Sequence, residues 1–77
     1  MRYFFNIREQ GDFLADDTGV ELPSLDAVQT EAVRTAREMM ADGILTGKAL
    51  DESVFEVTDE KGKLVTSVRF GDAVSHD

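Results

Sequence analysis

With the exception of Phe4, apolar and polar residues alternate with a period of two over residues 2–8, RYFFNIR. This alternation is typical of a strand with one face on a core, and aromatic and β-branched side chains favour strands. Residues 9–12, EQGD, favour a turn because their glycine can adopt a positive φ, and a short apolar run follows at 13–15. The pattern predicts a hairpin. A second turn at 16–19 and a brief extended piece then lead to Pro23, which cannot donate to a strand ladder and ends the sheet. The expected buried face of the first strand carries Tyr3, Phe5 and Ile7.

A helical period follows over residues 25–41. Ser24 is placed to cap the free amides of the first helical turn. Gly43 is placed to close the helix in a left-handed conformation, with Ile44 folding back on the last turn. The sequence therefore predicts a helix over 25–41 and a partly packed loop over 44–53. The apolar stripe of the helix comprises Leu25, Val28, Ala32, Ala36, Met39 and Met40.

Residues 54–60 and 63–70 predict a second hairpin around the dipeptide KG at 61–62. The turn residues accept either a two-residue loop or a three-residue loop that ends in a glycine bulge. The two-residue loop brings the apolar side chains onto one face, whereas the bulged loop divides them between two faces. We therefore expect the two-residue loop. Its opposed pairs are Phe55 with Val68 and Val57 with Thr66. The shared face comprises Phe55, Val57, Leu64, Val68 and Phe70.

These elements form one small domain over residues 1–77, in the order β-β-α-β-β. We expect an α+β fold of two layers, with one helix packed on one face of a four-stranded antiparallel sheet. A chain of this length buries a small core and is marginally stable alone, so self-association is one route to stability. The parts of the domain are the N-terminal hairpin region 1–22, the helix 25–41, the C-terminal hairpin 54–70 and a frayed end at 73–77.

The net charge of −8 is spread evenly along the chain, and no part of the chain carries a basic stripe. Such a surface repels phosphate groups, which disfavours binding to nucleic acid or to an anionic membrane. It suits either plain solubility or a basic protein partner. The chain has no cysteine, and its apolar N-terminal run is too short for a secretory signal or a membrane span. We therefore expect a cytoplasmic protein.

No group of residues meets the requirements of a catalytic or metal site. The triplet DTG at 17–19 has the letters of the aspartic-protease motif, but that enzyme needs two such aspartates. Asp16, Asp17 and Glu21 lack the alternating oxygen ligands of a calcium loop. His76 has no cysteine and no second histidine with which to build a metal site. We expect no enzyme activity, no cofactor and no bound metal.

The face of the sheet away from the helix is a stronger candidate for function. In the registers above it carries apolar side chains, and such side chains on a thin sheet point to self-association or to a partner. Scattered exposed apolar residues are also ordinary on a protein surface. The candidate interaction surface consists of Phe4, Val54 and Val65.

Taken together, the segments RYFFNIR, DDTGVELPSLDAVQTEA, FEVTDEKGKLV and VRFGDAV resemble a family of small acidic uncharacterised bacterial proteins (RYFF-type), common in soil and root-associated bacteria. This resemblance spans essentially the whole chain and implies the fold but no activity. More distantly, a strand hairpin followed by LPSLDAVQTEAVRTAREMM is similar to the half-domain of HicB-type antitoxins, which implies neutralisation of a small basic ribonuclease toxin. The chain departs from those antitoxins because it has no C-terminal DNA-binding helix-turn-helix or ribbon.

The sequence leaves the function unknown and supports three hypotheses. The first is a small non-enzymatic protein-interaction or regulatory module, with a homodimer as one form. The first alternative is a HicB-like antitoxin that sequesters a basic toxin. The second alternative is a small-ligand-binding protein with a pocket between helix and sheet, beneath Leu25, Val28 and Met39.

Overall fold

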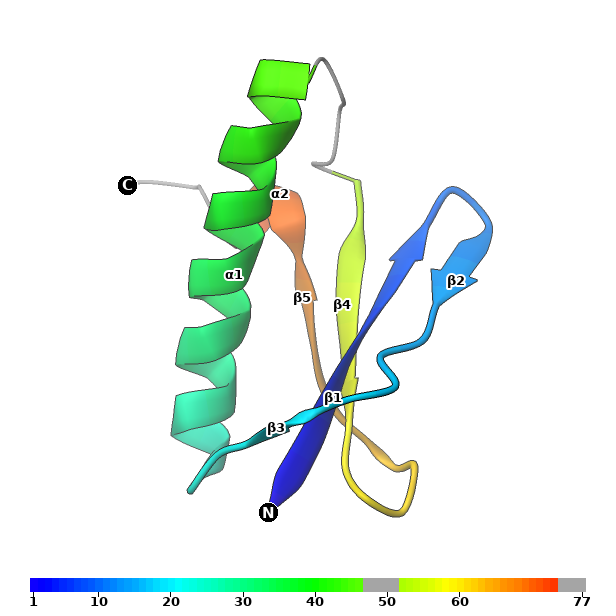
Figure 1. Cartoon of the computed structure of the whole chain (residues 1–77), viewed down its shortest axis with the longest axis vertical. Coiled ribbons are helices and arrows are strands. Elements are labelled where there is room, and N and C mark those ends of the chain that lie inside the picture. The colour runs from blue at the N-terminus through cyan, green and yellow to red at the C-terminus, as the bar shows by residue number, and fades with distance from the viewer. Residues whose placement is uncertain (47–51, 74–77) are drawn as a thin grey trace.

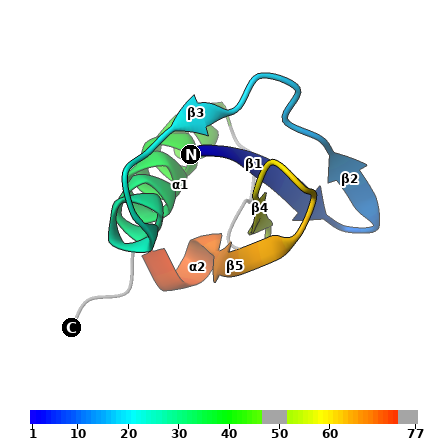
Figure 2. The same ribbon diagram turned by 90° about the horizontal axis from the view of Figure 1, so that it is seen from below.

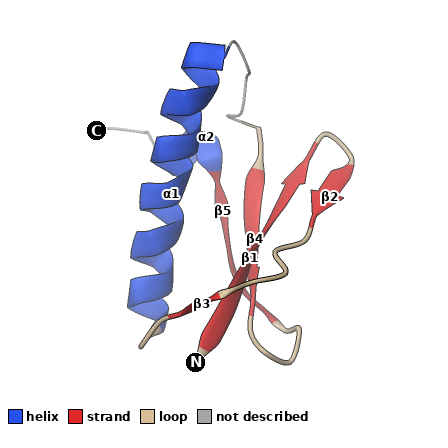
Figure 3. Ribbon diagram, viewed as in Figure 1, coloured by secondary structure: helices blue, strands red, loops and turns tan. Residues whose placement is uncertain are grey.

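A computed structural model of the chain describes residues 1–46 and 52–73 (Figure 1). Its strands form an antiparallel sheet, and its long helix lies on one side of that sheet (Figures 1 and 3). The α+β class predicted from the sequence is confirmed, and the elements follow roughly the predicted order. In chain order they are β1 (Arg2–Glu9), β2 (Asp12–Leu14), β3 (Val20–Glu21), α1 (Leu25–Thr46), β4 (Val54–Thr58), β5 (Leu64–Arg69) and α2 (Phe70–Ala73).

The sheet has the strand order β2-β1-β4-β5, and its neighbouring strands are antiparallel. The central pair, β1 with β4, runs from Phe4 opposite Thr58 to Arg8 opposite Val54. A fifth strand, β3, pairs with the start of β1, on the edge that β2 occupies further along. The brief extended piece expected before Pro23 is therefore a two-residue strand of the same sheet.

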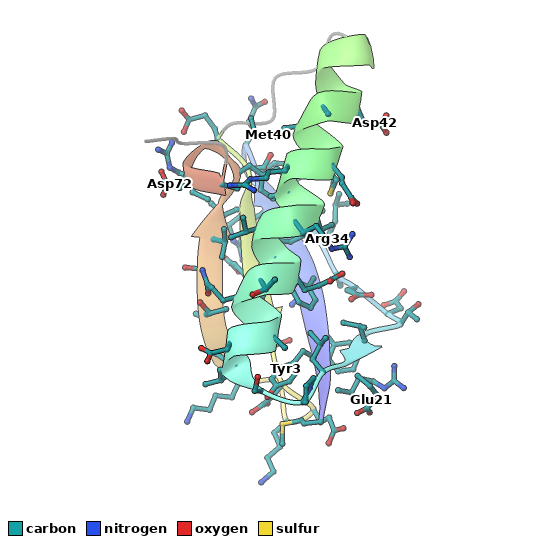
Figure 4. All side chains as sticks on the ribbon, turned by 90° about the vertical axis from the view of Figure 1, so that its left-hand side faces the viewer. Tyr3, Glu21, Arg34, Met40, Asp42 and Asp72 are labelled. Atoms are coloured by element: carbon teal, nitrogen blue, oxygen red, sulfur yellow. The ribbon has the colours of Figure 1, made fainter. Side chains whose placement is uncertain are left out.

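The core lies between α1 and the face of the sheet turned toward it, which we call the inner face (Figures 2 and 4). Ala32 and Ala36 are both fully buried in the middle of the helix, where small side chains let α1 lie close to the sheet. The Phe55 ring lies 5.7 Å from the Phe5 ring and 4.7 Å from the Phe70 ring, measured between centroids. The buried apolar residues are Tyr3, Val28, Ala32, Ala36, Phe55, Val57, Val68, Phe70 and Ala73.

The helix α1 begins where the sequence predicts but ends later. Ser24 caps it, because the amide of Ala27 donates to Ser24 Oγ at 3.1 Å. The predicted end before Gly43 is wrong, since the helix continues to residue 46. A glycine inside a helix costs only about 1 kcal/mol relative to alanine, so one glycine does not stop a helix that other interactions favour. Residues 44–46 of the predicted loop 44–53 are therefore helical.

The hairpin of β4 and β5 combines features of both loops that the sequence allows. The predicted pairs are present, namely Phe55 with Val68 and Val57 with Thr66. The loop itself is the longer one, because the amide of Asp59 donates to the carbonyl of Lys63 at 2.9 Å. Gly62 has a φ of 82°, the left-handed conformation that ends such a loop. The prediction of a two-residue loop is therefore wrong, although the pairs that it was chosen to explain are correct.

A β-bulge in β5 explains how the three-residue loop and the predicted pairs occur in the same hairpin. The register shifts between Val57 and Thr58, so Thr58 lies opposite Leu64 and Val65 is the extra residue. An extra residue reverses the faces of the side chains beyond it. Leu64, predicted on the buried face, is accordingly 55% exposed. Val65 is partly buried and packs against the core.

The chain passes from β5 directly into the short helix α2. Phe70, expected at the end of the strand, begins this helix and is fully buried. Ala73, expected in the frayed end, is only 4% exposed, and Arg37 Nε of α1 donates to its carbonyl at 2.6 Å. The expectations for 47–51 and 74–77 fall outside the described residues. The helix α2 therefore ties the end of the sheet to α1.

Candidate interaction surface

The sheet has an outer face, turned away from α1 (Figure 2). Side chains alternate along a strand, so the register assigns each of them to one face. Among the described segments, the loop 15–19 between β2 and β3 lies along the edge of β1 and covers the nearest part of this face (Figure 1). The outer face carries Phe4, Asn6, Arg8, Phe13, Val54, Glu56, Thr58, Leu64, Ser67 and Arg69.

Asp16 joins the loop 15–19 to β1 where no strand pairs with it. The strand β2 pairs with the end of β1 and β3 pairs with its start, which leaves the middle of this edge without a strand partner. There the amide of Phe5 donates to Asp16 Oδ2 at 3.1 Å. The other carboxylate oxygen accepts the amides of Thr18 at 3.0 Å and Gly19 at 3.1 Å. One carboxylate thus closes a gap in the sheet edge and fixes the turn that leads to β3.

These contacts hold the pKa of the Asp16 carboxyl below its ordinary value of 3.8. Partial burial is the largest single influence and acts in the opposite direction, because it disfavours the charged form. The amides of Gly19, Phe5 and Thr18 favour the charged form and together outweigh burial. Asp16 is therefore a charged structural group at neutral pH, whereas a general acid or base needs a pKa near the working pH.

Asn6 anchors the same loop from the outer face. It is only 6% exposed, and its Oδ1 accepts the amide of Asp16 at 2.9 Å. Its Nδ2 donates to the carbonyl of Glu56 on β4 at 2.8 Å. Gly19 lies so close to the ring of Phe4 that a Cβ built on this glycine would come within 2.8 Å of Phe4 Cε2. The loop therefore covers the part of the outer face at Phe4 and Asn6.

The three residues of the predicted surface lie in different environments. Phe4 and Val54 are on the outer face, and both are partly buried. Phe4 is covered by the loop at Gly19. Val65 packs against the core at the bulge. The structure therefore brings Phe4 and Val54 to one face without Val65, and their contact with a partner stays a prediction.

Two residues that the sequence analysis did not assign to the candidate surface are the exposed large apolar side chains of the outer face. Phe13 is 47% exposed on β2, and Leu64 is 55% exposed at the start of β5. The prediction placed Leu64 on the buried face because it assumed that side chains alternate without interruption along β5, and the bulge breaks that alternation. The glycine at 62 was the signal for the bulged loop. For Phe13 the signal was its position on a short strand at the edge of the sheet.

Charged groups on the outer face are paired with one another or with close neighbours. Arg8 Nε lies 2.8 Å from Glu56 Oε2, and the Arg8 guanidinium lies 4.7 Å from the centroid of the Phe13 ring. The hydrogen bond that Arg8 donates to Glu56, together with the charge of Glu56, raises the pKa of Arg8. Arg69 is paired with Asp72 at 3.1 Å. The face is close to balanced in charge although the chain carries −8, so apolar exposure is what distinguishes it.

The remaining candidate residues that the structure describes are not gathered into a site, and His76 lies outside the described residues. Within residues 1–46 and 52–73, no three side chains of metal-binding type gather together. In the same ranges, no helix has both the length and the apolar character needed to cross a bilayer. Val28, part of the predicted pocket beneath the helix, is fully buried in the core. An open hollow of about 560 Å³ instead lies along one side of α1, lined by Gln29, Thr30, Val33, Arg34, Arg37 and Glu38.

Comparison with known proteins gives one family and no individual relative. A family model described as a domain of unknown function, DUF6894, matches residues 2–71. The searches of curated proteins and of solved structures give no match. The match covers the sheet, α1 and the start of α2, which agrees with the expectation of a family that spans nearly the whole chain and has no assigned activity. The chain therefore belongs to the DUF6894 family, a domain of unknown function.

Proposed function

We propose that the chain is a small non-enzymatic protein-interaction module that binds its partner through the outer face of the sheet. The observation that carries this proposal is the exposure of Phe13 and Leu64 on a face whose charged groups are already paired. A partner that covers this face buries apolar surface without stripping water from unpaired charges. Val54 lies between Arg8 and Arg69 in the register, in the same row as Phe13, and adds apolar surface at that end of the face.

The character of the carboxylates supports a role without catalysis. Asp16 and Asp59 are the two carboxyl groups in the described segments whose pKa lies clearly below the ordinary value. The pKa of Asp59 is lowered chiefly by the amide of Lys63, which donates to its side chain in the hairpin loop. Both carboxylates therefore hold turns in place by accepting backbone hydrogen bonds.

Two charge-introducing variants test the proposal. Phe13→Asp and Leu64→Asp each place a charge on the outer face at a side chain that contributes little to the core. Leu25→Asp is the matched control, because Leu25 is 57% exposed at the start of α1 and lies off the outer face. The wild-type chain and the three variants serve as bait in an extract of the native cells. A partner retained by wild type and by Leu25→Asp, but lost from the two outer-face variants, supports the proposal. Equal retention by all four chains contradicts it.

Charge favours a basic partner for this module. A chain of net charge −8 attracts a basic protein through long-range electrostatic forces, which raises the rate of association. The HicB-like alternative is a special case, in which the partner is a small basic ribonuclease that the chain neutralises. A captured partner without an excess of lysine and arginine counts against that case. The same negative charge disfavours binding to nucleic acid and to anionic membranes. A cytoplasmic location suits an acidic protein that binds another protein.

A further inference from the structure

The strand β5 lies at the end of the sheet, and no described strand pairs with its outward edge. The amide of Phe70 donates to the carbonyl of Ser53 at 2.8 Å, which fixes the direction of the backbone groups along β5. In an antiparallel pair, successive residues point their backbone groups alternately toward the partner strand and away from it. Those of Val68 therefore point toward β4, and those of Ser67 and Arg69 point outward. In the order β2-β1-β4-β5, no strand of the described sheet lies on that outward side.

The helix α2 ends this edge at Arg69. It follows β5 directly and turns toward α1, with which it packs (Figure 2). Ser67 and Arg69 remain exposed. Unpaired backbone donors and acceptors on an edge strand are a template for the strand of another chain. The second half of β5 is therefore open to such a strand.

The hairpin end of β5 carries two lysines. Lys61 and Lys63 are both exposed. The two nearby carboxylates accept backbone amides. Asp59 Oδ1 accepts the amides of Lys61 at 2.9 Å and Lys63 at 3.0 Å. Glu60 Oε2 accepts the amide of Arg2 on β1 at 3.1 Å, so the side chain of Glu60 is turned away from β5. The two lysines balance these two carboxylates in charge, and no ion pair of either lysine side chain is found among the described residues.

The other end of β5 has an excess of negative charge. Arg69 lies 3.1 Å from Asp72 and 3.8 Å from Glu52. Two carboxylates therefore share one guanidinium, and their side chains are 68% and 75% exposed, respectively. Figure 4 shows Asp72 projecting from α2 on the side of β5. A strand with exposed lysines at one end and an excess of carboxylates at the other is complementary to a second copy of itself in the opposite direction.

We propose that two copies of the chain pair through β5 in antiparallel orientation, about a two-fold axis at Ser67, so that their sheets join into one. This register sets Ser67 opposite the same residue of the second copy, and Arg69 opposite Val65. It brings the lysine end of each strand to the Asp72 end of the other, and it places no like charges opposite each other. The bulge at Val65 confines the new ladder to a few residues, which makes the association reversible. The pairing uses the edge of the sheet and leaves the outer face free.

A single introduced cysteine tests the register. The chain has no cysteine of its own, so Ser67→Cys carries the only thiol. In the proposed register the two Cα atoms lie about 5.5 Å apart, within the span that a disulfide accepts. Thr30→Cys is the control, since Thr30 is an exposed residue of α1. Under mild oxidation we expect Ser67→Cys to form a disulfide-linked dimer at least about ten times faster than the control, because pairing raises the local thiol concentration. Equal rates overturn the proposal.

A charge exchange tests the orientation without cysteine chemistry. By analytical ultracentrifugation, we expect the mass of the wild-type chain to rise toward the dimer with concentration. Lys63→Glu is expected to weaken this association, and the addition of Asp72→Lys is expected to restore it. A monomer mass for wild type up to millimolar concentration overturns the proposal, as does a failure of the second substitution to restore association in a chain with an unchanged circular dichroism spectrum.

Phe13→Asp separates this pairing from the proposed function. Phe13 lies on β2, at the opposite side of the sheet from β5. The self-association must persist in this variant if it uses the β5 edge, and its loss assigns the dimer to the outer face and overturns the edge proposal. Partner binding through the outer face is tested by the extract experiment alone, and its outcome does not depend on whether the free chain is a monomer or a dimer.

Discussion

Replacement of Asp16 by asparagine tests whether one carboxylate closes the gap between β2 and β3. Asparagine keeps one acceptor oxygen, which serves either the amide of Phe5 or the amides of the turn, and its NH₂ group then faces N–H donors in the other position. A hydrogen bond to a charged group is worth about 1.5–3 kcal/mol, and a donor left unpaired costs about 1–3 kcal/mol when buried. The site is only partly buried. We therefore expect Asp16→Asn to lower the free energy of unfolding by about 2 kcal/mol, and Asp16→Ala by slightly more.

Urea unfolding followed by circular dichroism measures this change. With a slope of about 1 kcal/mol per molar urea for a small domain, the midpoint should fall by about 2 M. Asp17→Asn is the matched control, because it makes the same change of charge one residue further on, at an exposed side chain. A surface substitution of that kind costs less than about 0.5 kcal/mol. If Asp16→Asn costs no more than Asp17→Asn, the carboxylate does not hold the loop and the reasoning is refuted.

The same carboxylate makes the stability depend on pH. Its pKa in the folded chain lies below the ordinary value of 3.8, so the unfolded chain takes up this proton more readily. The stabilisation by Asp16 is then fully present above pH 3.8, and it is lost as the pH falls through the pKa that Asp16 has in the folded chain. The difference in stability between wild type and Asp16→Asn should therefore be constant near neutral pH and narrow in acid. A difference that stays constant in acid would mean that the charge of Asp16 does not stabilise the folded chain.

The other predictions concern backbone and packing, and urea unfolding measures each of them. Gly19→Ala and Gly11→Ala both place a side chain at a positive φ, but only the Cβ at 19 meets neighbours, at 2.8 Å, so it should cost at least about 1 kcal/mol more. Gly43→Ala should stabilise the chain by about 0.5–1 kcal/mol and raise its helix content, whereas a destabilisation would show that Gly43 caps the helix. Val28→Ala should cost about 2–3 kcal/mol, because Val28 is fully buried, and a cost under about 1 kcal/mol would mean a core that closes around the gap.

Local chemistry explains which parts of the fold could be predicted. The start of α1 follows from Ser24, whose side chain caps the helix directly after Pro23. The pairing of Phe55 with Val68 follows from the requirement that apolar side chains share one face. In each case the signal and the structure that it specifies lie within a few residues of each other or within one hairpin.

The parts that could not be predicted depend on contacts between distant segments. The turn at Asp16 is visible in the sequence, but its bond to Phe5 requires β2 and β3 to share one edge of β1. The helix continues through Gly43. A glycine near the end of a helical pattern can either lie within the helix or end it, and the sequence alone does not distinguish the two cases. The exposure of Leu64 depends on a single extra residue in β5, which reverses the face of every side chain beyond it.

The way this small domain is held together bears on where it can act. Side-chain oxygens of Ser24, Asp16 and Asp59 accept backbone amides at the turns, so the loops are fixed by polar contacts close to the surface. The apolar core needs only the inner face of the sheet. Phe13 and Leu64 are left outside both sets of contacts, and their replacement should change the free energy of unfolding by less than about 0.5–1 kcal/mol. Any loss of partner binding in their aspartate variants then reports on the surface itself, because the fold that presents it does not depend on them.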